Sequence, residues 1–210
     1  MIHNIVFDMG GVLINFDAQR YTARFVPDPA DYELIHRELF RSVEWIRMDR
    51  GSITDEEAVA SVCRRLPERL HQAVRDILDN WHRDIPPLDG IYELVKELKG
   101  KEYGIYLLSN TCSRFHSFRE NIPALHFFDG EFISADCHLV KPEPGIYLRF
   151  LEQFALRPEE CVFIDDVPLN IEAAIRCGFY GLVYHGDPAR LRRELRALGV
   201  DAGEACPSRP

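Results

Sequence analysis

The fold of this chain is decided near its start, by the stretch IHNIVFDMGG at positions 2–11. An apolar run from Ile2 to Phe7 ends in a carboxylate, Asp8, and the glycines Gly10 and Gly11 follow closely. A short apolar run that is bounded by turn residues is typical of a buried strand in a parallel sheet. We therefore predict a strand over residues 2–7 that places Asp8 at its carboxyl end.

Two more apolar runs end in polar clusters in the same way. Gly104–Leu108 leads into Ser109-Asn110-Thr111, and Cys161–Ile164 leads into Asp165-Asp166. Strand and helix patterns then alternate from about residue 87 to 199, which predicts a doubly wound α/β sheet. The other predicted elements are helices over residues 91–98 (with Asp89 as N-cap), 146–154 and 171–175, a strand over 181–184, and a last helix that Gly199 closes.

Residues 17–86 interrupt this alternation. They show helical periodicity with clear start signals, namely Asp28-Pro29 and the capping box from Thr54 to Glu57, and they contain no strand-like run. We predict an all-helical cap over residues 17–86, inserted after the first strand. The α/β core would then comprise residues 1–16 and 87–210.

Composition limits the classes of protein to which the chain can belong. It has 210 residues, 46% of them hydrophobic and 28% charged, which is an ordinary globular composition. A net charge of −9 argues against nucleic acid as a partner. No apolar run is long enough to span a membrane, and Asp8 comes too early for a signal-peptide core, so we predict a cytoplasmic protein. The six cysteines lack metal-site spacing and are expected to be reduced, and the oligomeric state is left open.

The polar clusters should meet at one place. Ligands of an open α/β sheet bind outside the carboxyl ends of its strands, so Asp8, Ser109, Asp165 and Asp166 should share a crevice. Lys141, just before Pro142 at the start of a helix, can reach the same crevice. Three carboxylates and one ammonium leave a negative excess that a divalent cation would balance. Ligands that are all oxygen favour Mg²⁺.

With a metal bound, the site could accept an anion. The Ser109 hydroxyl and backbone N–H groups of the turn from Met9 to Gly11 could hold a phosphoryl group. Asp8, a carboxylate beside the metal, is then the natural nucleophile for an aspartyl-phosphate intermediate.

These residues resemble the four motifs of the haloacid dehalogenase-like hydrolase superfamily, which occur here in the same order: Asp8, Ser109-Asn110, Lys141-Pro142 and Asp165-Asp166. The resemblance implies a Rossmann-like core with a helical cap and Mg²⁺-dependent hydrolysis of a phosphomonoester. It further implies that Asp8 is the nucleophile and a metal ligand, that Asp166 and the carbonyl of Gly10 ligate the metal, and that Asp165 supports them. Ser109, Asn110 and Lys141 would hold the phosphoryl oxygens.

Finer detail points to one branch of the superfamily. The sequence from Asp8 to Leu13, together with Asp49-Arg50-Gly51, most resembles the α-D-glucose-1-phosphate phosphatases. The implied substrate is a small phosphorylated metabolite, with sugar phosphates among the candidates. Asp17 and Arg50 are named as candidate substrate residues.

One position departs from the superfamily pattern. Gly10 stands where related chains carry a second aspartate, the general acid, and losing such a group typically costs about 10²–10⁴-fold in rate. A cap residue or water would have to supply the proton, unless the leaving group is good enough without it. A weakly active or non-catalytic phosphate-binding protein is therefore an alternative.

Other members of the superfamily, and one unrelated class, fit less well. A haloacid dehalogenase needs no metal and would have no use for Asp165-Asp166 together. A phosphonate hydrolase needs a lysine in the cap, but none of the four lysines lies within residues 17–86. A receiver domain carries its acidic pair before the phosphorylated aspartate, which is the reverse of the order here.

Overall fold

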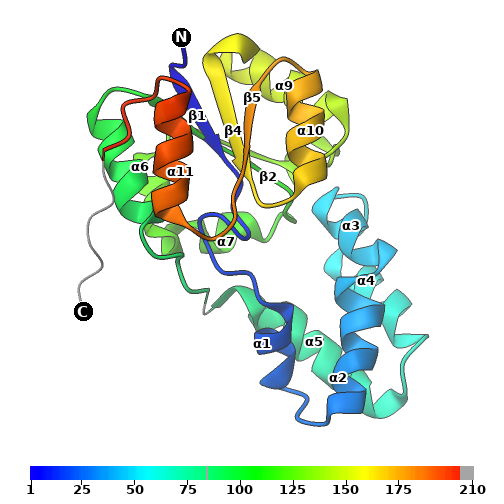
Figure 1. Ribbon diagram of the computed structural model, residues 1–210. Coiled ribbons are helices and arrows are strands. Elements are labelled where there is room, and N and C mark those ends of the chain that lie inside the picture. The colour runs from blue at the N-terminus through cyan, green and yellow to red at the C-terminus, as the bar shows by residue number, and fades with distance from the viewer. Residues whose placement is uncertain (84, 204–210) are drawn as a thin grey trace, which may run out of the picture.

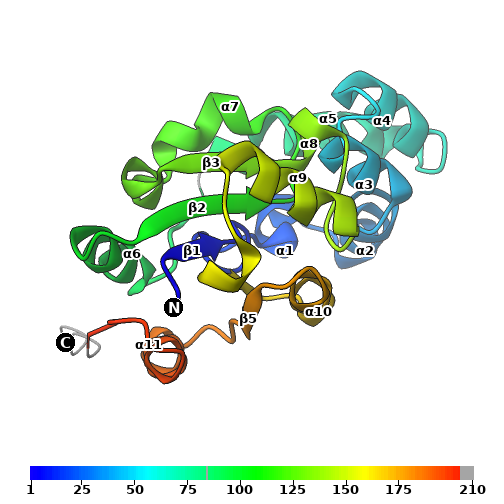
Figure 2. The ribbon, with the colours of Figure 1, turned by 90° about the horizontal axis from the view of Figure 1, so that it is seen from above.

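Five parallel strands form one sheet in the computed structural model, which describes residues 1–83 and 85–203 (Figure 1). The strand order is β3-β2-β1-β4-β5, so the strand that precedes Asp8 is central. Figure 2 shows β3, β2 and β1 side by side. The strands are β1 (Asn4–Phe7), β2 (Gly104–Ser109), β3 (Gly130–Ile133), β4 (Cys161–Asp165) and β5 (Tyr180–Val183).

Helices cover both faces of the sheet. Ile5 and Phe7 of β1 belong to the core under α6 (Ile91–Gly100) and α11 (Pro188–Ala197), whereas Val6 packs under α9 (Pro144–Phe154) and α10 (Pro168–Arg176). Successive side chains of a strand point to opposite faces, so a strand that is apolar at every position needs cover on both. Figure 1 shows α6 and α11 on one side of the sheet and α9 and α10 on the other. The predicted Rossmann-like doubly wound fold is confirmed.

The predicted elements of the core shift by one to three residues at their ends, as where β1 begins at Asn4 and not at Ile2, and two further details differ from the prediction. β3 was not predicted, because its four residues include Glu131, whose charge breaks the apolar pattern. The N-cap of α6 is Gly90 and not Asp89, since the chain turns through a left-handed conformation at Gly90 (φ 76°). The remaining short helices of the core are α7 (Phe115–Phe118), α8 (Ser134–Cys137) and 3₁₀ turns at Arg119–Asn121, Pro123–Phe127 and Pro158–Glu160.

The segment between β1 and β2 is helical, as expected. Asp28 caps α2 with Pro29 in its first turn, and the capping box between Thr54 and Glu57 is formed. Residues 17–83 contain helices and turns and no strand. The elements are α1 (Ala18–Ala23), α2 (Pro29–Ile35), a π-helix (His36–Phe40), α3 (Val43–Asp49), α4 (Asp55–Cys63), α5 (His71–Asn80) and 3₁₀ turns at Glu68–Leu70 and Trp81–Arg83. The boundaries of the cap at residues 17 and 86 stay predictions.

Two connections that run side by side join the helices to the core. The N–H of Asn15 donates to the carbonyl of Pro86 (2.9 Å), and the N–H of Leu88 donates to the carbonyl of Leu13 (3.0 Å). We call residues 13–15 and 86–88 the connecting ribbon. It leads the chain out of the sheet and back again at nearly the same point.

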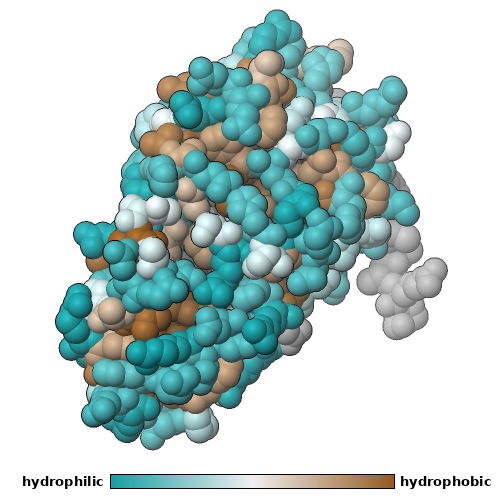
Figure 3. Space-filling view, turned by 180° about the vertical axis from the view of Figure 1, so that it is seen from behind, coloured by the Kyte–Doolittle hydropathy of each residue, from teal (hydrophilic) through white to brown (hydrophobic). Residues whose placement is uncertain are grey.

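Among the described residues, no helix is both long and apolar enough to cross a membrane. The face in Figure 3 is mostly hydrophilic, with scattered apolar patches. The five cysteines within residues 1–83 and 85–203 are free thiols, as expected. Cys206 and residues 204–210 of the predicted core lie outside the described residues.

Candidate active site

The sheet brings the predicted site residues to one edge. β1 pairs in parallel with β2 on one side and β4 on the other. Asp8 follows β1, while Ser109 and Asp165 end β2 and β4. The N–H of Asp8 extends the ladder by donating to the carbonyl of Ile164 (2.8 Å). All three side chains are therefore delivered to the carboxyl end of the sheet, where the sequence placed them.

Lys141 lies between two of the carboxylates. Its Nζ is 2.8 Å from Oδ1 of Asp8 and 2.7 Å from Oδ2 of Asp165, and it also donates to the carbonyl of Leu108 (2.9 Å). The lysine side chain is 1% exposed, and that of Asp165 is fully buried. The predicted ammonium is thus inside the site, where it balances buried negative charge.

Burial and charge act in opposite directions on these groups. Burial raises the pKa of Asp8 to about 6, the charge of Asp165 adds to this, and Lys141 opposes both. Burial alone would lower the pKa of Lys141, but Asp8 and Asp165 outweigh it, so that pKa is raised. Lys141 therefore stays protonated and holds the two carboxylates together.

Asp165 has its oxygens occupied by the protein. Besides the ammonium of Lys141, it accepts hydrogen bonds from the N–H of Val167 (2.8 Å) and from the amide of Asn170 (3.0 and 3.1 Å). A carboxylate with this many donors is suited to orienting its neighbours rather than to binding a metal directly.

Asp166 has the opposite character. Its side chain is exposed, and partial burial together with the charge of Asp165 raises its pKa. Oxygens of Asp8, Asp165 and Asp166 lie within 4.8 Å of one another, and the ammonium of Lys141 contacts the buried Oδ1 of Asp8 as an ion pair. The Asp166 carboxylate packs against the backbone of Gly11, where a Cβ would collide with it. Three carboxylates that offer hard oxygen ligands this close together fit a magnesium ion.

Some of the groups expected to hold phosphate already have hydrogen-bond partners within the protein. Ser109 is buried at the end of β2. The side-chain amide of Asn110 is clamped to the backbone of Lys141, donating to its carbonyl (3.0 Å) and accepting from its N–H (2.8 Å). The N–H of Gly11 donates to Ile14 (2.8 Å) and is therefore already used. Asn110 would reach a phosphoryl oxygen through its backbone, while its side chain fixes Lys141.

The two candidate substrate residues have other partners. Asp17 is the N-cap of α1 and accepts from the N–H groups of Gln19 (2.9 Å) and Arg20 (3.1 Å). Arg50 forms a two-pronged ion pair with Glu143 at the start of α9. Asp17 thus fixes the start of α1, and Arg50 ties the helical segment to the core. These bonds do not favour their predicted contact with substrate, which stays untested.

The turn after α3 docks the cap on the core through contacts that were not predicted from the sequence. The carbonyl of Asp49 accepts from Ser134 Oγ (2.5 Å). His138, in a left-handed conformation (φ 58°), donates through Nδ1 to the carbonyl of Arg50 (3.1 Å), and its own carbonyl accepts from the Arg50 guanidinium (3.2 Å). The motif Asp49-Arg50-Gly51 was visible in the sequence, but its partners lie more than eighty residues away.

Aromatic side chains stand over Gly10. A Cβ built on Gly10 would lie 3.7 Å from that of Phe16, which is ordinary contact. The Phe16 ring in turn meets Trp45 (5.8 Å between centroids) and Trp81 (5.6 Å). The neighbour of the Gly10 position is therefore an aromatic residue that packs against two tryptophans of the helical segment, and it leaves room for a Cβ at Gly10.

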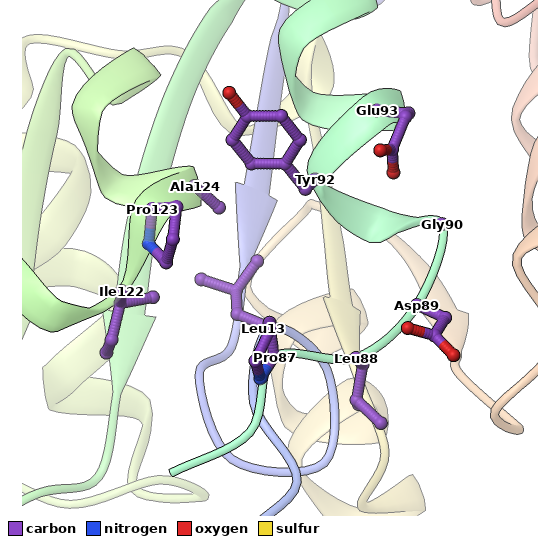
Figure 4. Close-up of a pocket in the computed structure, with 10 residues that line it drawn as sticks. All are labelled: Leu13, Pro87, Leu88, Asp89, Gly90, Tyr92, Glu93, Ile122, Pro123 and Ala124. Atoms are coloured by element: carbon purple, nitrogen blue, oxygen red, sulfur yellow. The ribbon is translucent and has the colours of Figure 1, made fainter. Parts of the chain in front are cut away.

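A cavity of about 370 Å³ lies elsewhere, beside the connecting ribbon (Figure 4). Leu13, Pro87, Tyr92 and Ile122 line it, and its walls contain none of the carboxylates of the site. It is therefore not the candidate active site, where Asp8 is only 8% exposed beneath the cap.

The fold and this cluster of side chains define a known class. A family model for haloacid dehalogenase-like hydrolases matches residues 2–178, from the start of the chain to the end of α10. The chain belongs to this family, and it is a hydrolase. The narrower resemblance to glucose-1-phosphate phosphatases stays a prediction.

Individual relatives are distant. D-ribitol-5-phosphate phosphatase of Bacteroides thetaiotaomicron is 28% identical, over 85% of this chain and 90% of the relative. Flavin mononucleotide hydrolase 1 of Arabidopsis thaliana is 24% identical over 75% of this chain, and the match spans 62% of that longer protein. A crystal structure of a related enzyme from Bacteroides thetaiotaomicron, in complex with magnesium and inorganic phosphate, has a TM-score of 0.72 at 24% identity, covering 91% of this chain and 99% of its own.

Proposed function

We propose that this protein is a Mg²⁺-dependent phosphatase that hydrolyses a small phosphorylated metabolite through an aspartyl-phosphate on Asp8. The observation that carries the proposal is the convergence of Asp8, Asp165 and Asp166 within 4.8 Å, with Lys141 against two of them. The phosphatase and hydrolase names of the two relatives support it. Sugar phosphates remain candidate substrates.

The chain's own residues divide the work. A carboxylate oxygen of Asp8 attacks phosphorus, and Lys141 holds that carboxylate in position while sharing charge with the incoming phosphoryl group. Ser109 and the backbone N–H at Asn110 would donate to phosphoryl oxygens. A magnesium ion held by Asp8, Asp166 and the carbonyl of Gly10 would neutralise charge on the phosphoryl group. Asp165 orients Lys141 and the following turn.

The geometry favours a phosphatase over a haloacid dehalogenase. A dehalogenase attacks carbon and has no phosphoryl charge to offset, so a second exposed carboxylate beside the nucleophile would serve no purpose. Here Asp166 is exposed next to Asp8 and Asp165. The alternative of a non-catalytic binding protein rests on Gly10 alone.

The test is hydrolysis of p-nitrophenyl phosphate with and without Mg²⁺. We expect turnover that requires the metal and that falls by several orders of magnitude in Asp8→Asn, because a neutral amide is a poor nucleophile. Asp136→Asn, an exposed carboxylate on the core that pairs with His116, is the matched control and should keep full activity. Metal-independent release of halide from 2-haloacids would identify a dehalogenase. Phosphate binding without turnover would identify a binding protein.

A panel of phosphorylated sugars, polyols and nucleotides would then identify the substrate. The quantity to compare is kcat/KM, because it reports how well the cap and core together stabilise each transition state.

A further inference from the structure

The core leaves one catalytic task unassigned. When the P–O bond of an alkyl phosphate breaks, the departing oxygen needs a proton, and Gly10 has no side chain to give one. The proton has to come from the cap or from water. The phosphatase reaction proposed above is assumed throughout.

The face of α3 that contacts Phe16 also carries a carboxyl group. Trp45 and Asp49 are four residues apart in α3, so they lie on the same face, one turn from each other. The Trp45 ring meets that of Phe16, and the Cβ of Phe16 is 3.7 Å from where a Cβ on Gly10 would stand. Asp49, at the carboxyl end of the helix, therefore lies on the same face of α3 as the ring that meets Phe16.

The backbone of Asp49 is anchored to the same edge of the sheet. Its carbonyl accepts from Ser134 Oγ (2.5 Å), and that oxygen accepts from the N–H of Thr111 (2.9 Å), two residues beyond Ser109. The next residue, Arg50, is fixed to Glu143 and to the carbonyl of His138. Contacts on both sides thus hold Asp49 at the carboxyl ends of the strands.

The surroundings of Asp49 suit a proton donor. Burial raises the pKa of its carboxyl to about 7, the charge of Asp8 adds to this, and Lys141 opposes it. A carboxylic acid that is partly protonated near neutral pH is what general acid catalysis requires.

We propose that Asp49, from the cap, is the general acid and base that replaces the aspartate absent at position 10. As Asp8 attacks phosphorus, the P–O bond to the leaving group breaks with its electron pair on that oxygen. The oxygen takes the proton from Asp49, which leaves an alcohol and the Asp49 carboxylate. Asp49 then accepts a proton from the attacking water. The bond between phosphorus and Asp8 breaks, its electrons return to the Asp8 carboxylate, and phosphate departs.

The first experiment grades phosphate esters by leaving-group basicity. Asp49→Asn keeps the size of the side chain but removes its ability to transfer a proton. We expect kcat/KM for glycerol phosphate to fall by about 10²-fold or more, and turnover of p-nitrophenyl phosphate, whose leaving group needs little protonation, to change far less when measured as the burst of nitrophenolate. An equal loss on both esters, or no loss on either, would overturn the proposal.

The second experiment returns the donor to the core. Gly10 has ordinary space for a Cβ, so Gly10→Asp can be combined with Asp49→Asn. We expect the double variant to recover alkyl phosphate hydrolysis, while Gly10→Asp alone gains little over the wild type, in which Asp49 already serves. A large gain in the single variant would show that the wild type lacks a donor and would overturn the proposal.

Two comparisons distinguish a loss of proton transfer from a loss of cap docking, and a failure of this proposal from a failure of the proposed phosphatase function. Arg50→Ala removes the ion pair with Glu143 and the bond to the carbonyl of His138, but it keeps the Asp49 carboxyl and the bond from Ser134 to its backbone, so its losses should be similar for alkyl and aryl esters. If Arg50→Ala lost activity on alkyl esters as selectively as Asp49→Asn does, the effect would come from docking of the cap, and the proposal would be overturned. If the wild type hydrolysed neither ester with Mg²⁺, the phosphatase proposal itself would fail, which is a distinct result.

Discussion

Replacing Glu44 with Gln should destabilise the cap by breaking the ion pair that fixes α3. Glu44 is 4% exposed, and its carboxylate accepts from both terminal nitrogens of Arg65 (2.9 Å each) and from Ser61 Oγ (2.6 Å). Arg65 and Ser61 belong to α4 and the turn that follows it, so one buried carboxylate ties α3 to its neighbour. Glutamine keeps the shape but loses the charge and one acceptor oxygen.

The magnitude follows from the acidity of Glu44. Hydrogen bonds from Arg65, helped by Ser61 and opposed by burial, lower its pKa from 4.5 to about 2. That difference corresponds to about 3 kcal/mol of stabilisation. Because Arg65 is 39% exposed, solvent screens part of the interaction, and we expect Glu44→Gln to lower the free energy of unfolding by about 2 kcal/mol at pH 7.

The sign of the pH dependence provides the stricter test. A group whose pKa is lower in the folded state contributes its stability fully above its ordinary pKa, and that contribution is lost as pH falls toward the folded value. The difference between wild type and Glu44→Gln should therefore be constant above pH 5 and shrink between about pH 4.5 and 2. Urea denaturation followed by circular dichroism at several pH values measures it.

A matched control is Glu172→Gln, which removes an exposed i,i+4 pair with Arg176 and should change stability by less than about 0.5 kcal/mol. If Glu44→Gln were as mild as this control, or its cost did not diminish in acid, the ion pair would not stabilise the cap as argued.

Three further outcomes follow from the site and the core. Gly11→Ala and Gly186→Ala both force alanine into a left-handed conformation (φ 73° and 76°), at a cost of about 1 kcal/mol each in urea denaturation. Gly11→Ala alone should also raise the Mg²⁺ concentration needed for half-maximal turnover, because its Cβ meets Asp166; identical Mg²⁺ titrations would contradict this. Tyr147→Phe removes a buried hydrogen bond to the carbonyl of Asn170 (2.8 Å) and should lower stability by about 1 kcal/mol, seen as a lower Tm, whereas an unchanged Tm would show that this bond contributes nothing. Chelation with EDTA should abolish turnover and excess Mg²⁺ should restore it, and full activity in the chelator would refute the metal site.

Local sequence was enough to predict the strands that end at the site. β1, β2 and β4 are apolar runs that stop at turn or carboxylate residues. The end of each apolar run therefore also marks where its polar side chain enters the site. β3 was missed because Glu131 interrupts its pattern. That charge is tolerated because its side chain pairs with Arg119, twelve residues earlier, which no local pattern reveals.

The residue roles at the site that could not be predicted from the sequence depend on tertiary contacts. From the residue type, the side chain of Asn110 was predicted to bind phosphate. In the structure it is bound to the backbone of Lys141, thirty-one residues away, and this contact cannot be seen in the local sequence. In the sequence, Asp49 is only the last residue of a predicted cap helix. The structure adds the hydrogen bond from Ser134 that holds its backbone at the edge of the sheet. The candidates that depend on strand ends could be predicted, whereas the roles of Asp49, Arg50 and His138 required the docked cap.

The connecting ribbon makes the helical segment exchangeable. Because Asn15 and Pro86 are hydrogen-bonded neighbours, a foreign segment with closely spaced ends could be spliced between them without moving β1 or α6. Such a graft would keep the nucleophile and the acidic pair, but it would discard Asp49 together with α3. Consider a segment taken from a relative that has its general acid on the core, as an aspartate two positions after the nucleophile. The chimera would then have no proton donor in the core or in the transplanted segment, unless Gly10 were changed at the same time.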